Sequence, residues 1–377
     1  MSARIPAEVF PPGEFLKEEL DERGWTQQEL AEIMDRPPRV ISEIIATKRA
    51  ITPETAQGLG DAFGTGPEYW MNLESQFALS KVRTAGDAVQ RRAALHAKYP
   101  VREMIKRGWL PQTTSVDVLE QQVCSFFGIA AANDAPTFLH AAKKTSYEDG
   151  TSTLQLAWLF RTKQLAEAQM VPKYSEKKLR DLLVRLRMLI AAPEETRHVP
   201  KLLAECGVRF VLVETLPSSK IDGACYWLDS NRPVIAMSLR FDRIDNFWFV
   251  LRHEIEHVLQ RHGAEGKIFI DQDLEGTHVN LPPEEKVANI AAAEFGVTQK
   301  ELADFCDRVA PYFSEVKVCG FAQRLGVHAG IVVGQLQRRL GRHDFLRKHQ
   351  VKVRSFVLSA GDADGWGVLT QQFEKQS

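Results

Sequence analysis

Two histidines four residues apart, with a glutamate directly after the first, are the side chains best suited to chemistry in this chain. They stand in the run His253-Glu254-Ile255-Glu256-His257. Positions four apart share one face of a helix, so both imidazoles can reach one tetrahedral zinc ion. Glu254 beside them can take a proton from a water molecule on the metal. The alternative, an ordinary helix with surface His and Glu, is disfavoured by the apolar flank 247–251.

A third protein ligand is needed, and Glu285 is the best candidate. A histidine six residues after His257, used by another class of zinc peptidases, is excluded because position 263 is a glycine. His262 is expected to be a solvated helix end. Glu284 and Glu285 are neighbours at the start of the next helix and point about 100° apart, so one of them should bind.

The choice of Glu285 depends on the residues that follow it along the helix. Ala288 and Asn289 lie one turn on, along the same face. A small residue and an amide would then stand beside the metal-binding helix, and Asn289 would orient a ligand histidine from the second layer around the metal. Glu284, behind Pro283, would remain a solvated charge favourable to the helix dipole.

The elements that position these residues change in character around residue 207. The β-branched runs 208–214 and 232–238, with 223–229 between them, predict a small sheet. A helix from Asp242 to about Arg261 carries the histidines, and a loop rich in Asp, Gly and Pro extends to Pro283. Another helix runs from Pro283 to Phe295, and helical sequence fills most of the remainder. Residues 81–200 also have helical periodicity.

The first 80 residues predict a compact domain of five helices. Thr26 with Glu29 three residues on is a capping box, and Thr52 followed by Pro53 starts the fourth helix. The segment 26–52 has the spacing of a helix-turn-helix, whose second helix would enter a major groove. A five-helix bundle with no DNA role would show the same periodicity.

Charge placement in this segment favours DNA binding. Residues 1–80 carry 7 basic and 14 acidic side chains, yet four of the basic ones lie on or beside the second helix, against the single acid Glu43. An acidic body with a basic edge makes phosphate contacts but weakens non-specific attraction. The residues expected to contact DNA are Gln27, Arg36, Arg39, Ser42, Lys48 and Arg49.

Length and composition bound the remaining possibilities. The 377 residues predict two or three domains, and 48 basic against 49 acidic residues give no overall attraction to nucleic acid. The five cysteines form no CxxC pair and are expected to be reduced thiols. With no run of 18 apolar residues and no signal-peptide layout, we expect a cytoplasmic location and no membrane contact.

A basic stretch lies near the other end of the chain. Residues 324–354 carry eight basic side chains and the single acid Asp344. The segment 322–327 followed by 331–333 has the pattern of a second helix-turn-helix. A helical cap on the preceding domain, with a solvated basic face, is the favoured interpretation.

Five segments of the first 80 residues resemble the Cro/lambda-repressor (XRE) fold in the form found in HigA-type antitoxins. The resemblance covers about 65 residues and implies a lambda-repressor-like DNA-binding domain. Where that family has a small polar cap on its recognition helix, this chain has Arg36-Pro37-Pro38-Arg39. The segments that carry the resemblance are 12–16, 26–31, 41–45, 48–56 and 69–73.

Residues 200–335 resemble the ImmA/IrrE family of metallopeptidases. The resemblance implies that His253, His257 and Glu285 bind zinc and that Glu254 is the catalytic base. It also implies cleavage of a repressor or antitoxin protein. Glu256 departs from the family, which favours glycine there, and is expected to affect the acidity of the site. The segments that carry the resemblance are 207–210, 221–224, 232–235, 247–249, 253–257, 285–289 and 321–327.

Together these features predict a mostly helical α+β protein in three parts. Residues 1–80 form the DNA-binding domain, 81–200 a helical middle region, and 201–377 a minimal zincin-like domain with a small sheet and a helical tail. The expected function is a DNA-binding transcription regulator with a Zn²⁺-dependent endopeptidase. The alternative is a HigA-like antitoxin and repressor whose metal site is structural, sensory or silent. Expected partners are operator DNA, a protein substrate or a toxin, and a second copy of the chain.

Overall fold

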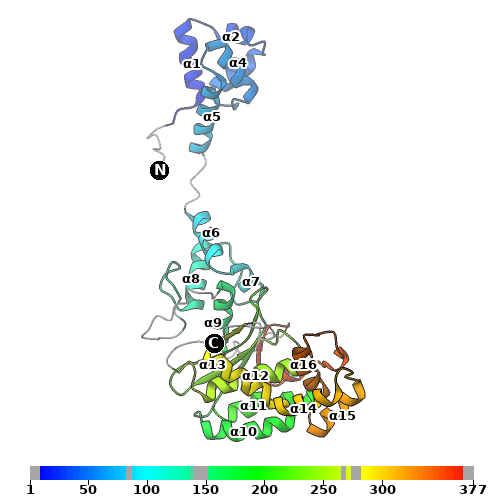
Figure 1. The fold of residues 1–377 in the computed structure, drawn as a ribbon. Coiled ribbons are helices and arrows are strands. Elements are labelled where there is room, and N and C mark those ends of the chain that lie inside the picture. Colours follow the sequence, from blue (N-terminus) through cyan, green and yellow to red (C-terminus); the bar gives the residue numbers. More distant parts are fainter. Residues whose placement is uncertain are drawn as a thin grey trace. The chain divides into compact units, whose positions relative to one another are not determined.

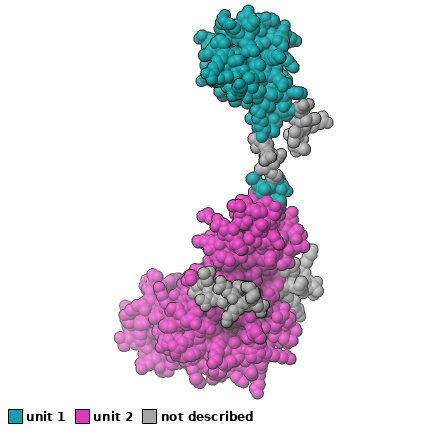
Figure 2. Space-filling view, turned by 180° about the vertical axis from the view of Figure 1, so that it is seen from behind, with its two compact units in different colours: residues 1–91 teal, residues 92–377 magenta. Residues whose placement is uncertain are grey.

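The computed structural model describes residues 9–81, 87–136, 138, 152–264, 269–272 and 282–367. Figure 1 shows the course of the chain, which is mostly helical with one small sheet. The chain divides into two compact units, residues 1–91 and residues 92–377 (Figure 2). Residues 92–200 therefore belong to the same compact unit as residues 201–377.

The first unit contains the five helices that its sequence predicts. The capping box of Thr26 and Glu29 is present, and the Thr52 hydroxyl accepts from the Thr55 backbone N–H at the start of the fourth helix. The third helix begins after Pro37 without a side-chain cap. The helices are α1 (Pro12–Arg23), α2 (Gln27–Ile33), α3 (Pro38–Ile45), α4 (Pro53–Phe63) and α5 (Pro67–Lys81).

The core of this unit fixes α3 against its neighbours. Leu16, Leu30, Ile41 and Trp70 are fully buried in one hydrophobic cluster. Gly13 allows α1 to approach α3 closely, because a Cβ there would lie 2.4 Å from the carbonyl oxygen of Ile44. The apolar face of α3 is therefore held inward, and its polar face is left at the surface.

The second unit is built on a mixed five-stranded sheet with the order β4-β2-β3-β1-β5. Strand β1 pairs in parallel with β3 and β5, whereas β2 pairs antiparallel with β3 and β4. The small sheet expected around residues 208–238 is confirmed. The strands are β1 (Arg209–Val213), β2 (Ile221–Trp227), β3 (Pro233–Met237), β4 (Phe269–Gln272) and β5 (Asp362–Asp364).

Two short strands add to the expected sheet. The loop predicted before Pro283 is wrong at β4, whereas β5 lies in a remainder that is mostly helical, as expected. Both strands are very short and lie at the two edges of the sheet, where pairing with β2 or β1 defines them. Runs of three or four residues carry no usable periodicity, so the sequence pattern does not reveal them.

Helices surround this sheet. Helix α12, which carries the histidines, packs against β2 and β3 on one side and against α13 on another, and α9 packs against β1. The helices before α12 are α6 (Ala88–Lys98), α7 (Val101–Lys106), α8 (Val116–Phe127), α9 (Thr153–Ala168), α10 (Glu176–Leu189), η1 (Pro193–His198) and α11 (Val199–Glu205). From α12 onward they are α12 (Ile244–Leu259), α13 (Pro283–Gly296), α14 (Gln299–Val309), α15 (Glu315–Leu325), α16 (Ala329–Leu340), η2 (Arg347–His349) and α17 (Arg354–Leu358).

Hydrogen bonds tie α9 to the sheet. The indole N–H of Trp158 donates to the carbonyl oxygen of Val213 at 2.8 Å, and the Tyr226 hydroxyl donates to Thr162 Oγ1 at 3.0 Å. Trp158, Thr162 and Tyr226 are all fully buried. A buried polar atom stabilises a fold only when it is paired, so these bonds fix the position of α9 on β1 and β2.

The pair α15 and α16 turns at Gly326, which has a left-handed backbone with φ of 65°. Helix α16 packs against α12, and its residues Val332, Val333 and Leu336 are fully buried. This arrangement agrees with the helical-cap interpretation of residues 322–333. Among the described helices, none alone is long and apolar enough to cross a membrane. Together α15 and α16 pass that test by length and composition, but they are bent by 118°.

Candidate functional site

The histidines of α12 and the glutamate directly after the first of them are buried in the core of the second unit. His253, Glu254 and His257 are each 0% exposed. Their apolar neighbours on the same helix, Ile255 and Val258, are also fully buried. Because polar groups are buried at a cost unless they are paired or bind a ligand, three of them on one helix indicate a dedicated site.

The two histidines and Glu285 converge on one point. The two Nε2 atoms of His253 and His257 are 3.0 Å apart. The Glu285 carboxylate lies 3.2 Å from Nε2 of His253 and 3.6 Å from Nε2 of His257. Ligand atoms held about 2.0–2.1 Å from a tetrahedral zinc ion are about 3.3 Å apart. The three side chains therefore fit one zinc ion in both chemistry and spacing.

Electrostatics at Glu285 suit a ligand role. Burial opposes ionisation of this carboxyl, but hydrogen bonds from the rings of His253 and His257 outweigh it and hold the pKa of Glu285 below its usual range. The carboxylate is supplied by the first turn of α13, which packs along α12. Asn289 lies one turn further along α13 and is half-buried. Its proposed role behind the ligands stays a prediction.

Glu254 faces the sheet, and a glycine provides its space. A Cβ built on Gly223 of β2 would lie 2.1 Å from Oε1 of Glu254 and 3.0 Å from Cγ1 of Val250. Real side chains do not approach so closely, so only glycine at position 223 leaves room for the carboxylate in this orientation. Resemblance alone connects the segment 221–224 with the site at the level of sequence, and the contact of Gly223 with Glu254 gives a physical reason.

His262 corrects the expectation of a solvated helix end. Its side chain is half-buried, and its Nδ1 lies 2.9 Å from Nδ1 of His257. Left-handed backbone at Arg261 (φ 55°) and Gly263 (φ 84°) folds the chain back after α12, which periodicity cannot reveal. A partner on the second ring nitrogen orients a ligand histidine. His262 therefore lies where it can orient the ring of His257, a contact that the sequence pattern does not reveal.

Glu256 does not join the cluster of His253, His257 and Glu285. Its carboxylate pairs with Arg252 at 2.8 Å and accepts from Gln260 Nε2 at 2.7 Å. Burial raises the pKa of this group, but the bonds from Gln260 and Arg252 outweigh it and lower the pKa of Glu256 overall. A glutamate at position 256 is thus stabilised by its ion pair with Arg252.

The residues expected to contact DNA all lie at the surface of the first unit. Two of the arginines pair with the same acid, since Glu43 Oε1 lies 2.6 Å from Nε of Arg39 and Oε2 lies 2.8 Å from Nε of Arg49. Among the described residues, no ion pair joins Lys48 to a carboxylate. The exposed residues are Gln27, Arg36, Arg39, Ser42, Lys48 and Arg49.

Comparison with known proteins identifies the first unit. A helix-turn-helix family model matches residues 16–70. The uncharacterized HTH-type transcriptional regulator YddM of Escherichia coli (strain K12) is 33% identical over 76 residues, which are 20% of this chain and 81% of YddM.

Two solved structures are also similar to this part of the chain. An addiction module antidote protein of the HigA family from Coxiella burnetii is 34% identical over 19% of this chain and 79% of that chain, with a TM-score of 0.19. The antitoxin HigA of Pseudomonas aeruginosa, solved with the higBA promoter, is 30% identical over 22% of this chain and 90% of that chain, with a TM-score of 0.21. Through its N-terminal domain, the chain belongs to the helix-turn-helix family of HTH-type transcriptional regulators.

Proposed function

We propose that this protein is a DNA-binding transcription regulator whose second unit is a zinc-dependent endopeptidase acting on a repressor or antitoxin-type protein. The observation that carries the peptidase proposal is the convergence of His253, His257 and Glu285 within 3.6 Å, with the buried Glu254 next to the first ligand. The resemblance of residues 200–335 to ImmA/IrrE metallopeptidases supports the same assignment.

In this proposal each residue of the site has a separate task. Zinc, when bound, polarises a peptide carbonyl and lowers the pKa of a water molecule. His253, His257 and Glu285 hold the ion, and His262 fixes the ring of His257 from behind. Glu254 accepts the proton of the attacking water and later delivers it to the leaving amine. Gly223 leaves the space that the Glu254 carboxylate occupies.

The first unit supplies the DNA-binding function. Family membership and the higBA promoter in the structure of a relative support binding of promoter DNA. Helix α3 is then the recognition helix, with its buried face against the core and Arg39 and Ser42 on its outer face. Lys48 and Arg49, just beyond its end, would contact phosphates together with Gln27 and Arg36. A dimer would bind two half-sites.

One alternative function follows from the names of the HigA-type relatives. In that case the chain is an antitoxin-like repressor that binds a toxin, and the metal site is structural, sensory or silent. The two functions differ in whether protein bonds are cut, so a proteolysis readout separates them.

The experiment compares cells expressing the wild-type chain with cells expressing Glu254→Gln, using mass spectrometry of protein N-termini. The variant keeps the ligands and removes the base, so we expect its zinc content to equal that of the wild type. New protein N-termini that appear when the wild type is expressed should be absent when the variant is expressed. Glu284→Gln, beside the ligand Glu285, is the matched control and should behave as wild type. Equal N-termini from wild type and Glu254→Gln, or none from wild type, would overturn the peptidase proposal.

A further inference from the structure

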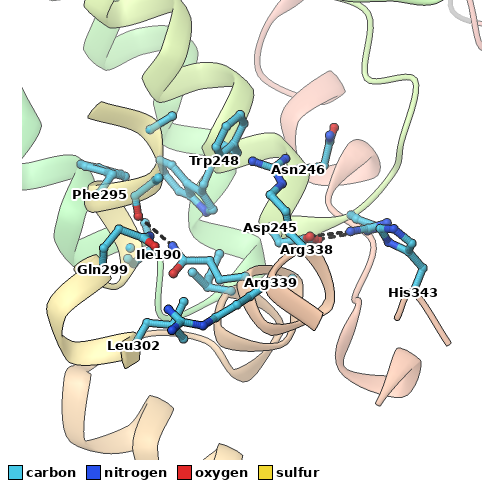
Figure 3. Close-up of a pocket in the computed structure, with 18 residues that line it drawn as sticks. Ile190, Asp245, Asn246, Trp248, Phe295, Gln299, Leu302, Arg338, Arg339 and His343 are labelled. Carbon is cyan, nitrogen blue, oxygen red and sulfur yellow. Dashed lines mark hydrogen bonds and ion pairs between the residues drawn. The ribbon is translucent and has the colours of Figure 1, made fainter. Parts of the chain in front are cut away.

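A pocket separate from the candidate metal centre opens between α12, α13, α14 and α16, with a volume of about 260 Å³. None of the three candidate zinc ligands lines it. Figure 3 shows Trp248 and Phe295 on one wall, with Arg338 and Arg339 reaching in from α16. Phe249, Leu302 and Ile331 complete an apolar lining. A pocket of this size and composition suits a small molecule with an apolar body.

The pocket also contains buried donors without acceptors. The indole Nε1 of Trp248 and the amide Nδ2 of Asn246 have no hydrogen-bond partner among the described residues, although these residues are only 3% and 6% exposed. Both residues line the pocket. A buried donor left unpaired costs about 1–3 kcal/mol, so the indole N–H of Trp248 beside this pocket indicates that an acceptor group binds there. Asn246 is two residues away on α12 and points about 200° from Trp248, so it does not share that acceptor.

The acceptor is expected to be negatively charged. Asp245 is the one acidic residue of the lining, and the guanidinium of Arg243 already pairs with it. Arg338 lies over the ring of Phe249, with its guanidinium carbon 4.0 Å from the ring centroid. Arg339 has an exposed side chain, and within the described part of the chain no carboxylate pairs with it. The lining therefore carries a net positive charge.

A further polar atom lies on the wall formed by α16. Gln335 donates through Nε2 to the carbonyl oxygen of Ala293 at 2.9 Å, which fixes its amide, and its Oε1 is buried without a partner among the described residues. This oxygen can accept from a water molecule or from a hydroxyl on the ligand. Because an amide is neutral, Gln335 adds a polar contact and leaves the net positive charge of the lining unchanged.

We propose that this pocket binds a small organic carboxylate with an apolar body. The carboxylate accepts from the indole N–H of Trp248 and pairs with Arg339, and the apolar body packs against Phe249, Phe295 and Leu302. A carboxylate matches the site because it supplies several acceptor lone pairs and one negative charge. The site is independent of the zinc proposal, since it shares none of the ligands.

The test uses the full chain labelled with 5-fluorotryptophan and titrated with 4-phenylbutanoate. Among the seven tryptophans, the resonance that disappears in Trp248→Phe identifies the pocket in a fluorine NMR spectrum. We expect this resonance to shift in a saturable way, and the resonance of Trp25 in the first unit to stay fixed. The neutral analogue 4-phenylbutanamide should bind about tenfold more weakly, because it lacks the charge.

Two arginine variants locate the charge contact. Arg339→Met should weaken binding of 4-phenylbutanoate about tenfold, whereas Arg347→Met, an exposed arginine outside the pocket, should leave it unchanged. Unshifted resonances of the other tryptophans show that each variant is folded. A fixed Trp248 resonance at saturating probe, equal binding of acid and amide, or an unaffected Arg339→Met would each overturn the proposal.

Discussion

The two units of this protein hold their functional side chains in opposite ways. In the first unit the candidate DNA-contacting residues are all exposed, and the core that folds the domain is a separate hydrophobic cluster. In the second unit His253, Glu254 and His257 are fully buried and belong to the interior of α12. An exposed site can change while the fold stays the same, whereas a buried site and its fold constrain each other.

This difference determines which evidence identifies each unit. The first unit is placed by similarity to known helix-turn-helix proteins over residues 16–70. The proposal for the second unit depends on distances and burial, because ligand geometry is fixed by the surrounding core. Substitutions at the site of the second unit should therefore abolish zinc binding or activity almost completely. Substitutions in the first unit should lower DNA affinity in small steps whose size depends on the salt concentration.

The largest effect is expected at the third ligand. Glu285→Ala should lower zinc affinity more than about a hundredfold, since even loss of a partner behind a ligand costs 10- to 100-fold. Glu284→Ala, one residue earlier on α13, should change it little. A competitive titration with a chelating dye measures both. Stronger loss in Glu284→Ala would move the ligand to Glu284, and retention in both would place the third ligand elsewhere.

The next effect concerns the clearance beside Glu254. Gly223→Ala places a methyl group only 2.1 Å from the present position of Oε1 of Glu254. The carboxylate must move, and a displacement of about 1 Å at a catalytic group can cost roughly a hundredfold in rate. We expect retained zinc and a large loss of peptidase activity on the identified substrate. Gly320→Ala, where nothing lies within 4 Å of the new Cβ, is the control. Full activity of Gly223→Ala would refute the positioning role.

The smallest effect is expected at the DNA surface. Replacing Lys48 and Arg49 by Ala should weaken binding to promoter DNA about tenfold and reduce the salt slope by about one counterion for each phosphate that the variant no longer neutralises. Lys17→Ala, an exposed lysine of α1, is the control. Electrophoretic mobility shifts at several salt concentrations measure both quantities. An unchanged salt slope would contradict the phosphate contacts, and no binding by wild type would make the unit a protein-interaction domain.

Local signals in the sequence predict much of the fold. Thr26 with Glu29 and Thr52 with Pro53 locate two helix starts, because capping depends on residues close in the chain. The four-residue spacing of His253 and His257 likewise depends only on helix geometry. These features follow from short-range rules, and sequence reasoning recovers them.

Features that depend on distant parts of the chain could not be predicted in this way. The clearance between Gly223 and Glu254 depends on how α12 packs on β2. Strand β5 is defined by its pairing with β1, about 150 residues earlier in the chain. Both require tertiary packing, which a single sequence does not encode in a readable pattern. The contact of His262 with His257 is local, but it depends on a left-handed turn that hydrophobic periodicity does not reveal.

The most direct test of the proposed zinc site is the zinc content of the purified full chain, combined with X-ray absorption at the zinc edge. We predict one zinc ion per chain, bound by two histidine nitrogens and carboxylate oxygen with no sulfur, and loss of the ion in a variant with His253 and His257 replaced by Ala. Absence of zinc from the wild-type chain after reconstitution and dialysis, a sulfur ligand, or full zinc retention in that variant would contradict this prediction.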